Sequence, residues 1–72
     1  MTNTELLEEF IQKSGKKKMY LAEKVGLSSA GFRNCCINKA EFTASQIQVL
    51  CDELGIKNLK QKQAVFFAPA DA

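Results

Sequence analysis

The chain has 72 residues, a formal net charge of +2 and no histidine. This length predicts one domain near the lower size limit for a fold without disulfides or a metal, because so small a body buries a modest share of its surface. The composition, 46% hydrophobic and 25% charged with one proline, is typical of a globular protein, and no apolar run is long enough to predict a transmembrane helix.

Residues 2–14 are predicted to form the first helix. Thr2 and Glu5 have the spacing of a capping box, in which a hydroxyl and a carboxylate three residues apart satisfy free backbone N–H groups. The apolar residues that follow recur at helical spacing and form one face: Leu6, Leu7, Phe10 and Ile11. Gly15 is predicted to end this helix in a left-handed conformation.

Residues 17–25 are predicted to form a second, short helix. Its inner face is expected to consist of Leu21, Ala22 and Val25. Gly26 follows at the point where the helix is expected to end, and Leu27 is expected to enter the core beneath the turn.

A third helix is predicted from about Ser29 to Ile37, with a cap offered by Ser28 or Ser29. Its inner side is expected to carry Phe32, Cys35 and Cys36. Asn38 is predicted to leave the helix in a left-handed conformation, because asparagine tolerates a positive φ.

Residues 39–42 are predicted to form a loop, and Thr43 with Gln46 forms another capping box that begins a fourth helix. The inner face of this helix is expected to be Ile47, Leu50, Cys51 and Leu54. Gly55 is predicted to end it.

Asn58 is predicted to cap a fifth helix through about Val65, and residues 69–72 are expected to form a frayed, flexible tail. The short connections leave one domain over residues 1–68. The expected core comprises Phe10, Leu21, Ala22, Val25, Leu27, Phe32, Ile47, Leu50 and Leu54.

The charges are distributed unevenly along the chain. Between residues 13 and 39 the only acid is Glu23, whereas the bases are Lys13, Lys16, Lys17, Lys18, Lys24, Arg33 and Lys39. A basic middle flanked by acidic ends indicates a polyanionic partner at one face. Without a motif beside it, however, a run of charge is usually a solvated surface.

The segment from Lys18 to Cys35 supplies such a motif. Ala22 is a small residue where two helices would cross closely, and Gly26, four residues later, suits a left-handed turn. Core positions follow ten and thirteen residues after Ala22, at Phe32 and Cys35. This spacing is that of a helix-turn-helix.

The segment LAEKVGLSSAGFRNCCINKAEFTASQIQVLCDELGI resembles the five-helix DNA-binding domains of the phage repressor and Cro families. Together with the later AVFFA, its second half is similar to short prophage-associated regulators. The resemblance extends over residues 2–68. It implies an all-α, lambda-repressor-like domain that binds double-stranded DNA, regulates transcription and inserts the second helix of the motif into the major groove.

By similarity, five residues face base edges and the flanking backbone: Ser28, Ser29, Ala30, Arg33 and Asn34. The resemblance implies that Arg33 pairs with guanine O6 and N7, that Asn34 pairs with adenine N6 and N7, and that Ala30 contacts a thymine methyl group. Phosphate contacts are expected from Lys16, Lys17, Lys18 and Lys39. Lys17 and Lys18 stand where the family often has a hydroxyl and a glutamine, which favours a phosphate contact there over a glutamine contact.

Gly31 is unusual, because a glycine inside a helix costs roughly 1 kcal/mol relative to alanine. One interpretation is a close approach of the helix to the wall of the DNA groove. The other is close packing against the preceding helix.

The sequence offers little for catalysis or for metal binding. It has no histidine and no Gly-rich phosphate loop, and Glu8 and Glu9 are adjacent on a helix and point in different directions. Cys35 and Cys36 are adjacent and Cys51 is isolated, which fits neither a disulfide framework nor a zinc site. We therefore expect no enzymatic activity, cofactor or metal, and three cysteines that act as small buried hydrophobic residues. The acidic N-terminus does not resemble a signal peptide, which predicts a cytoplasmic protein.

Two questions about partners stay open in the sequence. The main alternative function is a helix-turn-helix module that docks to a protein, as an antitoxin or antirepressor would. RNA binding is a weaker alternative, because no exposed aromatic platform is evident.

The second question is the oligomeric state. One recognition helix reads few base pairs, so we expect a homodimer on a pseudo-palindromic operator. One of Phe66 and Phe67 is expected to cover the core and the other to meet its mate across the two-fold axis. Alternatively, both lie in the core and the protein pairs only on DNA.

Overall fold

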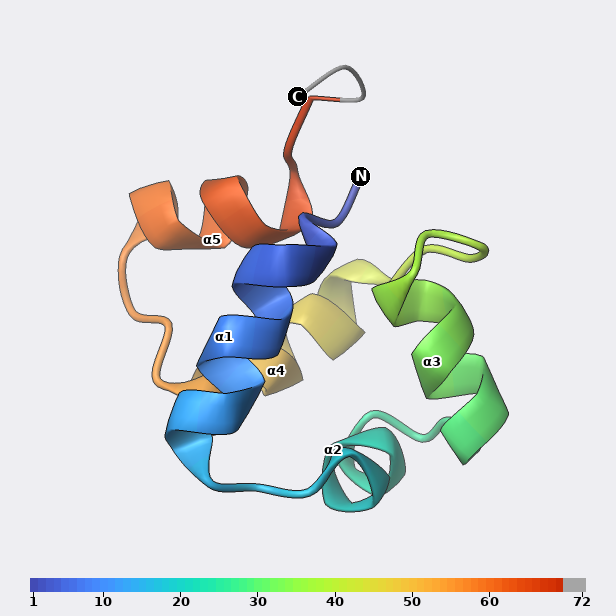
Figure 1. Ribbon diagram of the computed structural model, residues 1–72. Coiled ribbons are helices and arrows are strands. Elements are labelled where there is room, and N and C mark those ends of the chain that lie inside the picture. Colours follow the sequence, from blue (N-terminus) through green and yellow to red (C-terminus); the bar gives the residue numbers. More distant parts are fainter. Residues whose placement is uncertain (70–72) are drawn as a thin grey trace.

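The computed structural model describes residues 1–69, which form five helices and no strand (Figure 1). The helices are α1 (Thr4–Ser14), α2 (Lys18–Lys24), α3 (Ser29–Cys36), α4 (Ala44–Leu54) and α5 (Leu59–Phe66). α1 packs against α4 and α5, while α2 packs against α3 and α4. In Figure 1, α5 and α3 lie on opposite sides of α1. The predicted all-α class and the five predicted helices are confirmed.

The starts of α3, α4 and α5 follow the predicted caps. Ser28 Oγ accepts from the backbone N–H of the third residue of α3 at 3.0 Å. Thr43 and Gln46 make both hydrogen bonds of a capping box, and Asn58 Oδ1 accepts from the third residue of α5 at 2.7 Å. Each bond satisfies an N–H group that a helix leaves free at its first turn.

The predicted start of α1 is wrong. Its cap is Asn3, whose Oδ1 accepts from Leu6 N at 3.1 Å, and not Thr2. As an N-cap, Thr2 would offer its C=O to the helix. That C=O instead accepts from Asn38 Nδ2 at 2.8 Å, while the Thr2 N–H donates to Asn38 Oδ1 at 2.9 Å. A tertiary contact between distant residues has replaced the local one.

Apart from the start of α1, which lies two residues later than predicted, the helix ends lie within one residue of those predicted. α2 is one residue shorter at each end, α3 ends one residue earlier, and α5 extends one residue further, to Phe66. The three residues predicted to adopt a left-handed backbone, Gly15, Gly26 and Asn38, all do so. Gly55, predicted only to end α4, also has a positive φ.

Buried apolar side chains form a single cluster between the helices. Seven of the nine residues predicted for the core are buried in it: Leu21, Ala22, Val25, Phe32, Ile47, Leu50 and Leu54. The other two predictions are wrong, because Phe10 and Leu27 are partly buried and pack against the cluster from outside. In α1 the inward positions are Leu7 and Ile11, one helical turn apart, and Phe10 lies at the edge of that face.

Phe42 is a core residue that the helical spacing does not reveal. It lies in the predicted loop between α3 and α4, yet it is 8% exposed. Its ring centroid lies 5.8 Å from that of Phe32 and 5.9 Å from that of Phe66, both in edge-to-face contact. Such pairs contribute about 0.5–1.5 kcal/mol beyond burial. The loop residue therefore joins α3 to α5 through the core, and Ile56, after α4, is a second buried residue outside the predicted stripes.

The two C-terminal phenylalanines have different surroundings. Phe66 is buried, whereas Phe67 is 57% exposed. The expectation that one of them covers the core is confirmed, and the alternative that both lie in the core is wrong. Val65 is fully buried beside Phe66, so the end of α5 closes the core. Of the predicted tail, residues 70–72 lie outside the described residues.

All three cysteines are free thiols in the buried cluster, as expected for small hydrophobic residues. Burial raises the pKa of Cys36 to about 11 and also raises the pKa values of Cys35 and Cys51. At neutral pH the thiols are therefore protonated, which is the unreactive form. Within residues 1–69, no group of three or more His, Cys, Asp or Glu side chains is placed to hold a metal ion, and no helix is long and apolar enough to cross a membrane.

Candidate nucleic-acid interface

The turn between α2 and α3 is a compact hydrogen-bonded unit. Gly26 has a φ of 74°, which a residue with a Cβ rarely adopts. Its N–H donates to Glu23 O at 3.1 Å, and the Leu27 N–H donates to Ala22 O at 2.9 Å. These two bonds satisfy carbonyl groups at the end of α2 and form a Schellman motif. The side chain of Gln46, from α4, adds a bond from Nε2 to Val25 O at 3.2 Å, so α4 supports the turn.

The outer face of α3 carries the residues predicted to read bases. All five are exposed: Ser28, Ser29, Ala30, Arg33 and Asn34. Four of them, all except Ser28, line one shallow hollow together with Ile37 and Lys39. The Oγ of Ser28 accepts the capping hydrogen bond of α3, so the structure gives this hydroxyl a local role at the start of the helix.

Two of the four predicted phosphate-binding lysines are free charges. Lys17 and Lys39 are exposed and form no ion pair within residues 1–69. Lys18 is also exposed, but its Nζ lies 2.9 Å from Glu8 Oε1. To bind a phosphate, Lys18 would first have to leave this carboxylate, which costs little for an exposed pair.

Lys16 is the most strongly held of the four lysines. Its Nζ donates to Glu53 Oε1 and to Glu53 O, both at 2.8 Å. Glu53 lies in the last turn of α4, where a cation also interacts favourably with the helix dipole. The same ammonium lies 5.8 Å from the centroid of the Tyr20 ring, and Lys24 lies 5.5 Å from it. Lys16 therefore fastens the segment between α1 and α2 to the end of α4.

This contact predicts a pH dependence. The pKa of Glu53 lies below its ordinary value of 4.5. The main cause is the hydrogen bond from the Lys16 ammonium, and a hydrogen bond from Tyr20 adds to it. A carboxylate with a lowered pKa stabilises the fold above the pKa of the unfolded chain, and this contribution is lost as the pH falls through the folded pKa. Denaturant unfolding from pH 7 to pH 3 is therefore expected to show that Glu53→Gln is less stable than the wild type at pH 7 and that the difference closes below about pH 4.5. A constant difference at all pH values would contradict this role of Glu53.

Gly31 faces the turn that precedes α3. A Cβ built on Gly31 would lie 3.2 Å from Ser28 Oγ and 3.7 Å from Leu27 Cβ and Cδ2. These nearest atoms belong to the turn and not to α2, so close packing against the preceding helix does not account for this glycine. The position is the third of α3, where capping boxes routinely carry a residue with a Cβ.

We expect Gly31→Ala to raise the free energy of unfolding by about 0.5–1 kcal/mol, because alanine restricts the unfolded chain and favours the helix. The small shift needed at Ser28 Oγ is available to a rotatable hydroxyl. Urea titration of the two proteins measures the change, and Ala30→Gly on the exposed face is a matched control that should lower stability by a similar amount. A destabilised Gly31→Ala protein would show that Ser28 has no room to move.

Sequence reasoning missed the aromatic and apolar residues around this surface. Tyr20 is 41% exposed between two lysines, and its only signal in the sequence is a lysine four residues before it and another four residues after it. Met19 and Ile37, which are 72% and 42% exposed, line a second hollow of about 280 Å³ between α1, α2 and α3, which Arg33 also lines.

Comparisons of the chain with models of protein families, with curated proteins and with solved structures find no match. The best indication of function is therefore the unit of α2, the Gly26 turn and α3, with the side chains that it exposes.

Proposed function

We propose that this protein is a sequence-specific DNA-binding transcriptional regulator with a lambda-repressor-like fold, and that it acts without catalysis in the cytoplasm. The observation that carries the proposal is the α2–turn–α3 unit, in which α3 presents exposed Arg33 and Asn34 beside the free charges of Lys17 and Lys39. A helix-turn-helix docks by placing its second helix in the major groove, so an exposed polar face on that helix is what such docking requires.

In this proposal, Arg33 and Asn34 read sequence. Arg33 pairs with no carboxylate within residues 1–69, so its guanidinium is available for two hydrogen bonds to one guanine. The Asn34 amide offers a donor and an acceptor, which match the N7 and N6 groups of adenine. Ser29 and Ala30 lie one turn earlier on the same exposed helix, where they contact neighbouring bases.

The lysines supply affinity that does not depend on sequence. Lys17 precedes α2 and Lys39 follows α3, so the two free charges lie at the two ends of the unit and contact phosphates on either side of the groove. Lys16 and Lys18 reinforce this attraction once phosphates compete with their carboxylates.

Selection of bound sites from a pool of random duplexes tests the proposal. We expect enrichment of one motif, and an affinity for it that falls steeply as salt rises. Equal retention of all duplexes, or retention that salt does not affect, would contradict DNA recognition. The alternative of a protein-docking module is favoured by the exposed Met19 and Ile37, and it predicts no enrichment of any duplex.

A homodimer is the second part of the proposal. Leu59 and Phe67, 67% and 57% exposed, line one shallow surface of α5 with Lys62 and Gln63 between them. Leu59 is the first residue of α5 and Phe67 directly follows the last, and the hollow that both line places their side chains on the same side of the helix. A second copy that packs the same surface against them across a two-fold axis covers both, and it places two copies of α3 on one pseudo-palindromic operator.

Phe67→Asp is expected to abolish this association, because the substitution would bury a carboxylate against an apolar surface. Sedimentation of the free protein should change from dimer to monomer, and footprinting should lose the two half-sites about 10 base pairs apart. Gln61→Asp, on another side of α5, is the matched control and should sediment as the wild type does. A monomeric wild type that protects one isolated half-site would contradict the dimer.

A further inference from the structure

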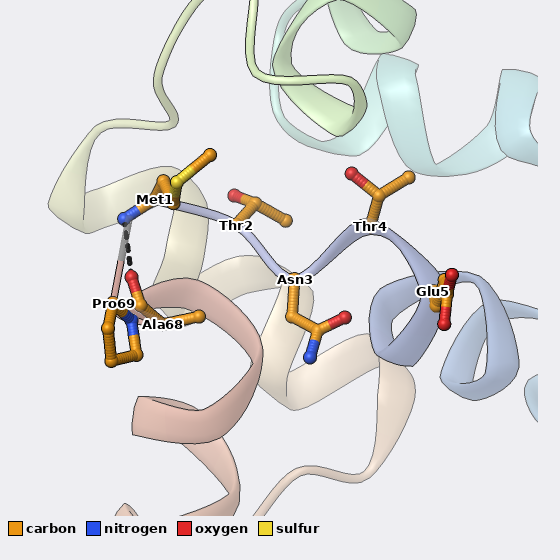
Figure 2. A pocket seen from close by; sticks show the side chains of 7 residues that line it. All are labelled: Met1, Thr2, Asn3, Thr4, Glu5, Ala68 and Pro69. Carbon is orange, nitrogen blue, oxygen red and sulfur yellow. Dashed lines mark hydrogen bonds between the residues drawn. The ribbon is translucent and has the colours of Figure 1, made fainter. Parts of the chain in front are cut away.

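The first four residues of the chain form a strap that is bound to the end of α5. Asn3 N–H donates to Val65 O at 2.7 Å, Ala68 N–H donates to Met1 O at 2.9 Å, and Met1 N donates to Ala68 O at 3.2 Å. Figure 2 shows the last of these bonds and the extended course of the strap beside Ala68 and Pro69. In the same view, the side chains of Thr2 and Thr4 point to one side of the strap and that of Asn3 points to the other.

The other side of the strap is bound to the end of α3. The Asn38 amide forms two hydrogen bonds with the backbone of Thr2, and Thr4 Oγ1 donates to Cys36 O at 2.8 Å. Cys36 is the last residue of α3, and Asn38 lies two residues beyond it with a φ of 65°. The strap therefore connects the C-terminal ends of two helices that lie on opposite sides of α1 (Figure 1).

α3 is a short helix that this connection supports at its C-terminal end. It has eight residues, and among the helices it packs chiefly against α2. The last carbonyl groups of a helix have no partners within it, and a short helix frays from that end. Here the Cys36 carbonyl has a partner in the strap, and the turn that follows is held in place through Asn38.

The held end of α3 carries two of the proposed base-reading residues, Arg33 and Asn34. Arg33 and Asn34 lie in its second turn, and their carbonyl groups accept from Ile37 N–H at 3.0 Å and from Lys39 N–H at 2.8 Å. The orientation of Arg33 and Asn34 and the position of Lys39 are thus fixed by the same turn that Asn38 attaches to Thr2.

We infer that Thr4 and Asn38 are positioning residues for sequence recognition, and that they act by holding the C-terminal half of α3 against the strap. This inference rests on the proposed DNA binding. Asparagine suits position 38 because it tolerates the left-handed backbone and also offers one acceptor and one donor, which match the N–H and C=O of Thr2. A glycine would adopt the same backbone without making either bond.

Three variants test the inference: Asn38→Gly, Thr4→Val and Asn3→Ala. The first keeps the left-handed backbone and removes both bonds to Thr2, and the second keeps the shape of the threonine and removes its donor to Cys36. Asn3→Ala is the matched control, because it removes the cap of α1 and touches neither Asn38 nor Cys36. The readouts are the ratio of affinities for the selected operator and a random duplex, and the hydrogen exchange of the Ile37 and Lys39 amides, at a temperature where circular dichroism shows every variant folded.

We expect Asn38→Gly and Thr4→Val to lower the affinity ratio by about fivefold or more, the loss that accompanies weakening of one bidentate base contact. Their Ile37 and Lys39 amides should exchange faster, while Asn3→Ala keeps the wild-type ratio and exchange. If the wild type prefers an operator and both variants keep that preference, or if Asn3→Ala loses as much of it, the inference is wrong and the proposed function stands. If the wild type prefers no duplex, the proposed function is wrong and the inference fails with it.

Discussion

Phe32→Ala is expected to lower the free energy of unfolding by about 3–5 kcal/mol, the usual cost of emptying a buried phenylalanine site. Phe32 is 2% exposed and is among the largest fully buried side chains of the cluster. Its ring also makes the edge-to-face contact with Phe42, which in turn contacts Phe66. The substitution therefore leaves a cavity and breaks one end of the aromatic row that joins α3 to α5.

The effect should be large relative to the total stability of the fold. A domain of this length typically has about 4–11 kcal/mol of stability, so the variant is expected to lose much of it and to melt roughly 15 °C or more below the wild type. Thermal unfolding followed by circular dichroism measures the shift. Met19→Ala is the control, because it removes a large apolar side chain from a site that is 72% exposed, and its stability should change by no more than about 0.5 kcal/mol. Equal melting temperatures for the two variants would show that the core is assigned incorrectly.

Arg33→Ala is expected to reduce discrimination at one base pair of the operator by about 1–3 kcal/mol, or roughly 5- to 150-fold in relative affinity. The physical reason is the loss of the proposed two-donor contact to one guanine, which no neighbouring side chain would replace. Titration of the wild type and the variant against the selected operator and its single-base substitutions measures the change.

Arg33→Lys and Lys17→Ala separate the charge of this surface from its geometry. Arg33→Lys keeps the positive charge and loses the planar fork, so it should bind random duplexes as the wild type does and still lose discrimination. Lys17→Ala should weaken binding to all duplexes alike and lower the slope of the salt dependence by about one. If Arg33→Ala weakens the operator and random duplexes equally, its assignment as a base-reading residue is wrong.

The sequence alone determined the number, order and approximate bounds of the helices, because those depend on local interactions. Gly26 and the capping box of Thr43 and Gln46 act within a few residues of themselves, and the apolar spacing of α4 follows from the helical period. Exposure of the α3 face was also predictable, since the inward residues Phe32, Cys35 and Cys36 leave the other positions to solvent.

Only the tertiary structure decided which residues meet across the chain. Phe42 is buried because α3 and α5 both supply aromatic rings to it, and Lys16 is bound because the end of α4 lies within reach of its ammonium. Thr2 is not a cap because Asn38, 36 residues away, takes its backbone groups. Such contacts depend on how whole helices pack, and a local pattern of residues does not contain that information.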